Sequence, residues 1–277
     1  MAAGPNQAFF PSGFPELFSL WNRFPDALPF AGGTEFIRDQ EQQLPVLPKN
    51  IISLENINEL KRITRTERYL EIGAMVRLNE IINLGKIVPE ILLKTLEGIA
   101  GFHIRNMATI GGNLCERSRR LDCCAPLAAL DAQYELRNLN SVRWISASRF
   151  SASSPPVLSD RELLTRIRIP LDQWNFSRYK KFKTPGSNDY GSVIVFILKN
   201  EKNILTDLHV AYSGSGLFQN RQNKNPLVGK HLPLDQRDAG LFYEDWKKYL
   251  ENNKFNEELR NAQVLNFIED TLSDFTD

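Results

Sequence analysis

The chain has 277 residues, with 34 basic and 33 acidic side chains and a formal net charge of +1. Because the charges balance, no long-range field of one sign would draw the chain to nucleic acid or to an anionic membrane, and neither is expected as a partner. Hydrophobic residues make up 42% and charged residues 24% of the chain, which argues against disorder for most of it.

Spacing of apolar residues predicts a mixture of short helices and short strands. In chain order, the predicted elements are a helix within 9–28, a loop and short helix over 29–37, a strand over 50–54, a helical turn over 57–63, a strand over 69–74, helices over 78–84 and 89–99, a glycine-punctuated loop over 101–113, a helix over 126–130, paired strands over 134–136 and 142–145, a strand over 163–169, strands over 192–199 and 205–212, and helices near 240–252 and 259–272. Regular βαβ alternation is absent, which predicts an α+β fold rather than a doubly wound sheet.

The three cysteines, Cys115, Cys123 and Cys124, lie in one short segment. An odd number of cysteines in a chain of this size is not typical of a secreted disulfide framework. Residues 1–10 lack the pattern of a signal peptide, and no apolar run reaches the roughly 20 residues that span a bilayer. We therefore expect a cytoplasmic protein in a reducing compartment.

A first candidate motif is Ala31-Gly32-Gly33-Thr34-Glu35. Glycines allow a positive φ and let a backbone approach a ligand without a Cβ in the way. Successive amide N–H groups in such a loop can bind phosphate oxygens, and a helix that starts at Thr34 or Glu35 would add its dipole. Alone, the motif is weak, because paired glycines before a helix more often form only a tight turn.

A second motif, Arg105-Asn106-Met107-Ala108-Thr109-Ile110-Gly111-Gly112-Asn113-Leu114, has the same ingredients. Two such loops suggest a long diphosphate ligand that is held from two sides. Neither loop continues into Gly-Lys-Ser/Thr, which argues against a nucleoside triphosphate. Gly-x-Gly-x-x-Gly is absent as well, which argues against a Rossmann site.

The pair of motifs resembles the two FAD-binding loops in the flavin domain of the molybdopterin dehydrogenases, the family of xanthine and carbon monoxide dehydrogenases. The resemblance extends to segments 51–54, 70–74, 205–208 and 227–230 and so covers most of the chain. It implies a two-lobed, PCMH-like FAD-binding domain over 1–170, with lobes at about 1–55 and 56–170. A small α+β domain like that of the carbon monoxide dehydrogenase flavoprotein would follow over 171–277.

The resemblance also implies a set of FAD contacts. Members of the two loops in this set are Ala31, Gly32, Gly33, Thr34, Glu35, Thr109, Ile110, Gly111, Gly112 and Asn113. Asp122 matches a carboxylate that accepts hydrogen bonds from ribityl hydroxyls, although its type and place also suit the N-cap of the helix that follows. Leu164 resembles a leucine that packs on the cofactor, or is an ordinary strand-core residue. Lys183 matches a lysine that reaches the flavin ring, or is a solvated charge.

The chain departs from the family pattern at Cys115-Glu116-Arg117-Ser118-Arg119-Arg120, where small residues with Ser-Pro are usual. The three arginines suit a nicotinamide dinucleotide phosphate, an acidic partner surface or plain solvent exposure. Ile99 stands where some members have an aromatic residue near the flavin. The three cysteines are fewer than the four thiolates that an iron–sulfur cluster normally needs, so no metal site is expected.

The resemblance implies an FAD-dependent oxidoreductase subunit with non-covalent FAD. It would pass electrons from [2Fe–2S] clusters of a partner, through FAD, to NAD or another acceptor. The partners would be a separate molybdopterin-binding large subunit and a [2Fe–2S] small subunit. Two other functions stay open: a degenerate flavin-domain scaffold without redox activity, and a stand-alone flavin oxidase.

Overall fold

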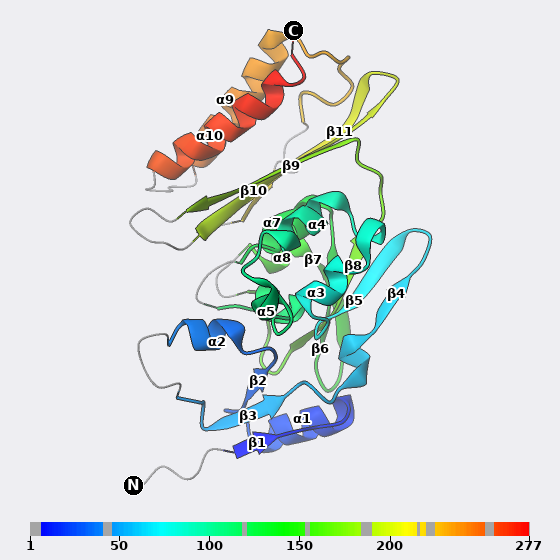
Figure 1. Cartoon of the computed structure of the whole chain (residues 1–277), viewed down its shortest axis with the longest axis vertical. Coiled ribbons are helices and arrows are strands. Elements are labelled where there is room, and N and C mark those ends of the chain that lie inside the picture. Colours follow the sequence, from blue (N-terminus) through cyan, green and yellow to red (C-terminus); the bar gives the residue numbers. More distant parts are fainter. Residues whose placement is uncertain are drawn as a thin grey trace.

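The computed structural model describes residues 7–40, 46–117, 121–152, 156–183, 190–214, 217–219, 225–252 and 258–276. Three sheets follow one another along the long axis of the molecule, from the N-terminal end to the C-terminal end (Figure 1). Helices and strands alternate irregularly in the described ranges, which confirms the α+β prediction.

The N-terminal sheet is parallel and has the order β1-β3-β2, formed by β1 (Gln7–Phe9), β3 (Asn50–Ser53) and β2 (Leu28–Phe30). Between β1 and β2 lies α1 (Phe14–Arg23), whose Leu17, Phe18 and Trp21 enter the core, as the predicted amphipathic pattern requires. The short α2 (Thr34–Arg38) follows β2.

The middle sheet is antiparallel and has the order β4-β5-β8-β6-β7. Its strands are β4 (Ile63–Arg65), β5 (Tyr69–Gly73), β8 (Leu163–Pro170), β6 (Gln133–Arg137) and β7 (Val142–Ser146). The helical segments before and within this part of the chain are η1 (Asn58–Lys61), α3 (Leu78–Ile82), η2 (Gly85–Ile87), α4 (Glu90–Glu97), α5 (Phe102–Arg105), α6 (Ile110–Leu114), α7 (Cys124–Ala129) and α8 (Ala147–Phe150). Of these helices, α4, α7 and α8 contact strands of the third sheet.

The C-terminal sheet is antiparallel, with the order β12-β11-β10-β9. Its strands are β9 (Phe176–Lys183), β10 (Tyr190–Glu201), β11 (Ile204–Ser213) and β12 (Leu217–Gln219). Figure 1 shows α9 (Gln236–Asn252) and α10 (Glu258–Ser273) on one side of this sheet, with α4 and α7 on the other.

Strand β10 is buried on both faces. Val193, Val195 and Ile197 belong to the core that contains the helices and strands of the middle sheet. The alternate residues Ile194, Phe196 and Leu198 belong to the core under α9 and α10. Because side chains alternate along a strand, one strand serves both cores and couples the C-terminal part to the rest of the chain.

Most long elements match their predictions, but the eight-residue β9 has no predicted counterpart, and other differences fall in short segments. β2 falls where a loop is predicted, and α5 and α6 fall in the predicted glycine-punctuated loop over 101–113. These segments have only three to five residues, too few for a periodic pattern. Tertiary contacts rather than intrinsic propensity therefore determine them.

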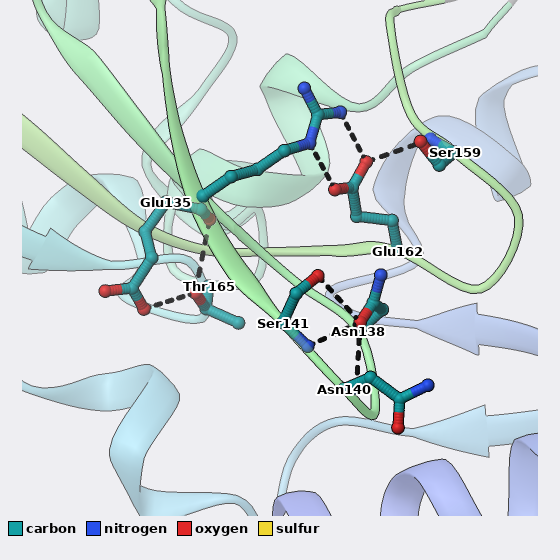
Figure 2. A network of polar contacts seen from close by, with 8 residues as sticks. Glu135, Asn138, Asn140, Ser141, Ser159, Glu162 and Thr165 are labelled. Carbon is teal, nitrogen blue, oxygen red and sulfur yellow. Dashed lines mark hydrogen bonds and ion pairs between the residues drawn. The ribbon is translucent and has the colours of Figure 1, made fainter.

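A polar network lies at the turn between β6 and β7 and at the start of β8. The Asn138 side chain accepts hydrogen bonds from the backbone N–H groups of Asn140 and Ser141, which forms the turn predicted between β6 and β7 (Figure 2). Nearby, the Glu162 carboxylate accepts bonds from Arg143 at 2.6 and 2.7 Å and from the Ser159 N–H at 2.9 Å. The Arg143 bonds hold the pKa of Glu162 below its usual value.

We predict that Arg143→Met destabilises the protein by about 1–3 kcal/mol at pH 7, because the Glu162 side chain, 2% exposed, loses its charged partner. Because the pKa of Glu162 is lower in the folded protein than its ordinary value of 4.5, the ionised carboxylate stabilises the fold above pH 4.5. This stabilisation is lost as the pH falls through the pKa that Glu162 has in the folded protein. The variant should therefore lose less stability than the wild type on acidification. Urea unfolding at several pH values measures both effects, with Arg65→Met on exposed β4 as control. Equal stability of the two variants at pH 7 would contradict the role of the pair.

Candidate functional site

The first glycine motif forms the link between β2 and α2. Gly33 has φ +66°, and a Cβ there would lie 2.7 Å from the Phe30 ring, so only glycine fits without strain. As predicted, α2 begins at Thr34. The first N–H groups of a helix have no intrahelical acceptor, so this end of α2 presents donors to a ligand. Glu35 in the same turn forms an ion pair with Arg38 at 2.7 Å.

The second motif is held by its backbone and by one hydroxyl group. Thr109 is the N-cap of α6, and its Oγ1 accepts a hydrogen bond from the Gly112 N–H at 3.1 Å. The N–H groups of Ile110 and Gly111 donate to the carbonyls of Val76 and Ala74, at 3.0 and 2.8 Å. These bonds fix the motif against the segment that follows β5.

Gly111 and Gly112 have different surroundings, although they are adjacent in α6. Gly111 is buried, and a Cβ there would lie 2.7 Å from both the carbonyl oxygen and the Cβ of Ala74. Gly112 is exposed, and its Cβ would lie 3.0 Å from the Thr109 hydroxyl and 3.9 Å from Ala31 of the first motif. Neither residue has a positive φ. Position 111 therefore requires glycine because Ala74 leaves no space for a side chain, whereas Gly112 faces the first loop.

The two glycine loops are in direct contact. A Cβ at Gly32 would collide with the Met107 carbonyl group, so the backbones of the two loops approach as closely as glycine allows. The resulting junction, formed by Ala31, Gly32, Met107 and Gly112, is called the loop junction below. It has the close approach of two backbones that a diphosphate held from both sides requires.

Asp122 stands beside the second loop. The Asn113 side-chain oxygen accepts a hydrogen bond from the Cys123 N–H at 3.1 Å, which anchors the turn that contains Asp122 to α6. The helix that follows has Cys123 as its N-cap and no side-chain cap bond, so Asp122 does not cap it. Asp122 forms an ion pair with Lys181, Nζ to Oδ1 2.6 Å, and the two side chains are 12% and 17% exposed.

The Asp122 carboxylate retains a capacity to accept hydrogen bonds. Oδ1 is buried and lies 2.6 Å from the Lys181 ammonium group, which compensates its charge. A carboxylate has about four lone-pair sites, so one cation leaves room for further donors. The arrangement fits a hydroxyl-bearing ligand such as the ribityl chain of FAD.

Leu164 and Lys183 are the two other predicted site residues. Leu164 is 2% exposed in β8, opposite Leu136 in β6, and so offers almost no surface to a ligand. Lys183 is exposed at the end of β9. Sequence reasoning missed Lys181, although the alternation of a strand places it on the same side of β9 as Lys183.

Arg105 and Asn106 of the second motif have structural roles that sequence reasoning did not assign. Arg105 Nη1 donates to the carbonyls of Ile99 and Ala100 at 2.8 and 2.7 Å, just after α4. The Asn106 side chain accepts from Asn79 of α3 at 2.7 Å. The two residues tie the second loop to the neighbouring helices and have no part in the loop junction.

Among the three cysteines, Cys123 and Cys124 are buried and Cys115 is partly buried. Burial raises the pKa of Cys115 to about 12 and that of Cys123 well above its usual value, which keeps both thiols protonated. Ser118, Arg119 and Arg120 lie outside the described residues, and Arg117 is exposed. Within the described ranges, no group of three His, Cys, Asp or Glu side chains could hold a metal ion. No helix in those ranges has the length and apolar character needed to cross a membrane.

Comparisons with known proteins agree with this geometry. The model of the FAD binding domain in molybdopterin dehydrogenase matches residues 5–172. Xanthine dehydrogenase 2 of Arabidopsis thaliana is 29% identical over 246 residues, 80% of this chain but 18% of that protein. The glyceraldehyde dehydrogenase medium chain of Sulfolobus acidocaldarius is 26% identical over 215 residues, 75% of each chain.

Among solved structures, a chain of the quinoline 2-oxidoreductase from Pseudomonas putida 86 has a TM-score of 0.74 and 25% identity, over 88% of this chain and 86% of that chain. The chain spans 18% of the length of the two plant xanthine dehydrogenases that it matches. The family match covers more than half of the chain and contains both glycine loops and Asp122. The chain therefore belongs to the family of FAD-binding domains of the molybdopterin dehydrogenases.

Proposed function

We propose that this chain is the FAD-carrying electron-transfer subunit of a molybdenum hydroxylase of the xanthine dehydrogenase type. It receives electrons from [2Fe–2S] clusters of a partner subunit and passes them to NAD or another acceptor. The observation that carries the proposal is the loop junction, where Gly32 lies against the Met107 carbonyl beside the buried Asp122 carboxylate. Bound FAD supplies the redox chemistry, and the protein supplies its binding, orientation and electrostatic surroundings.

Each part of the site has a role in holding FAD. The residues from Ala31 to Glu35, at the start of α2, bind the diphosphate with their N–H groups. Gly112 leaves room for the diphosphate on the other side of the junction. Asp122 accepts hydrogen bonds from ribityl hydroxyls, and Lys183 reaches toward the flavin ring from the end of β9. Leu164 supports the core beneath the site, in line with its 2% exposure.

Separate subunits supply the remaining centres in this proposal. A molybdopterin-binding large subunit carries out the hydroxylation, and a [2Fe–2S] small subunit delivers the electrons. The relative from Sulfolobus acidocaldarius is named a medium chain and matches over 75% of its length, which supports a subunit role. The exposed Arg117, with Arg119 and Arg120 outside the described residues, is our candidate for a contact with an acidic partner surface.

We predict that the purified protein binds FAD without a covalent bond. The proposed contacts are backbone N–H groups of the glycine loops and the Asp122 carboxylate, which bind through hydrogen bonds. Acid precipitation should release all of the flavin into the supernatant, where chromatography identifies it as FAD. Flavin in the pellet would contradict non-covalent binding. FMN as the bound flavin would leave the diphosphate loops without their ligand, and a protein that cannot bind FAD at all would favour the scaffold function.

We predict that Gly112→Val weakens FAD binding by at least about tenfold while the apoprotein keeps its unfolding free energy within about 1 kcal/mol. The branched side chain would point toward Ala31 and fill the loop junction, but Gly112 is exposed and not part of the core. Quenching of flavin fluorescence measures the affinity, and urea unfolding measures the stability.

Two further variants serve as references for Gly112→Val. Gly101→Val is the control, because Gly101 has open space around its Cβ position and an extended backbone. Gly111→Val should instead destabilise the fold, because its Cβ would press on Ala74. Unchanged FAD affinity in a folded Gly112→Val protein would remove the second loop from the site.

We predict that the isolated chain exchanges electrons with artificial carriers but hydroxylates no purine or aldehyde, because hydroxylation needs the molybdenum subunit. A substrate panel on the isolated chain, repeated after co-expression with its partners, tests this. Association with the partners should weaken as the salt concentration rises, since arginines form part of the contact. Turnover of a hydroxylation substrate by the isolated, metal-free chain would overturn the assignment.

A further inference from the structure

Strand β9 presents one face to the FAD-binding part of the chain. On that face Ser177 receives the Lys94 ammonium group of α4, 3.4 Å from its carbonyl oxygen, and the Tyr179 hydroxyl lies over Gly98. On the opposite face Arg178 pairs with Asp274 near the end of α10 at 3.2 Å, and Phe182 enters the C-terminal core. The alternation therefore directs Lys181 toward the FAD-binding part.

The register of the sheet fixes the position of Lys181. Lys181 is paired with Val193 of β10, and Val193 is buried in the core that α4 and α7 share with the middle sheet. The lysine side chain is only 17% exposed, so packing limits the directions in which it can point. Its ammonium group reaches Asp122 across the boundary between the C-terminal sheet and the FAD-binding part.

Asp122 is in turn connected to the second glycine loop. The bond from the Cys123 N–H to Asn113 fixes the turn, and Asn113 lies in α6, whose N-cap is Thr109. A continuous series of contacts thus runs from β9 through Lys181 and Asp122 to α6. In this series the ion pair is the contact between β9 and the turn that contains Asp122, and both of its side chains have little exposure.

We propose that Lys181 is a positioning residue of the flavin site: its ammonium group holds the Asp122 carboxylate in the orientation in which it accepts hydrogen bonds from the ribityl chain. The C-terminal sheet must then be docked for FAD to bind with full affinity. A half-buried carboxylate without its cation would turn toward solvent or be destabilised, because burial of an unpaired charge is costly. This inference rests on the proposed function, since it assigns the acceptor role to Asp122.

The test compares four single variants and one double variant by FAD titration and thermal unfolding of the apoprotein. Lys181→Met should weaken FAD binding by about tenfold, the effect expected when one charged hydrogen-bond partner is misplaced. Lys181→Arg, which keeps the charge, should restore affinity to within about threefold of the wild type. Lys180→Met is the matched control, because Lys180 is exposed on the same strand and lies near the Phe182 ring on the other face. It should bind FAD as the wild type does.

Asp122→Asn shows whether Lys181 acts through the carboxylate. In the Asp122→Asn background, Lys181→Met should cause no further loss of FAD affinity, because the group that it positions has already been changed. A full additional loss there would show that Lys181 acts elsewhere and would overturn the inference. So would wild-type affinity in Lys181→Met.

Failure of the proposed function gives a different result. In that case the wild type itself binds no FAD, whereas failure of this inference leaves wild-type binding intact. Should Lys181→Met not fold, Lys181→Arg and Asp122→Asn remain as readouts. Wild-type affinity in Asp122→Asn would then contradict the role of the pair.

Discussion

The close approach of two backbones at Gly32 is the contact on which the site depends. The Met107 carbonyl group occupies the space that any Cβ at position 32 would need. A side chain there would separate the two loops by at least the thickness of a methyl group, and a diphosphate bound by both loops would lose the contacts on one side. Arg105 and Asn106 do not touch Gly32, but their bonds to the neighbouring helices fix the segment that precedes Met107.

The burial of β10 on both faces gives the chain its second constraint. Val195 and Phe196 are adjacent in the sequence and belong to different cores. Separation of the C-terminal sheet from the FAD-binding part would expose one whole face of β10, and the loss of that apolar burial opposes it. The C-terminal sheet is therefore a rigid support for the site, although helices α9 and α10 lie far from the loop junction in Figure 1. Rigid support of this kind keeps binding groups within the small tolerances that a cofactor requires.

The sequence predicted both loops and the long elements other than β9, because each of these has a strong local signal. Leu17 and Trp21 at helical spacing predict α1, and the paired glycines predict turns whatever surrounds them. The helical state of Gly111 and Gly112 was not predicted, because glycine disfavours a helix and only the bonds to Val76 and Ala74 impose one. Gly111 is required because Ala74, about 35 positions earlier in the chain, leaves no room for a side chain. Gly112 faces Ala31, about 80 positions earlier. A local sequence pattern contains neither of these neighbours.

Lys181 illustrates the remaining limit of prediction from sequence. Lys180, Lys181 and Lys183 are the same residue type in one short segment. The alternation of a strand places Lys180 on one face and the other two on the opposite face, but it does not distinguish those two. The choice between Lys181 and Lys183 depends on where β9 lies over the middle of the chain, which is set by the register with β10 and by the contacts with α4. The half-buried lysine is bound to Asp122, whereas the exposed one stands at the end of the strand. Burial thus turns one of three similar charges into a fixed contact, since a cation with little access to water must keep its anion close.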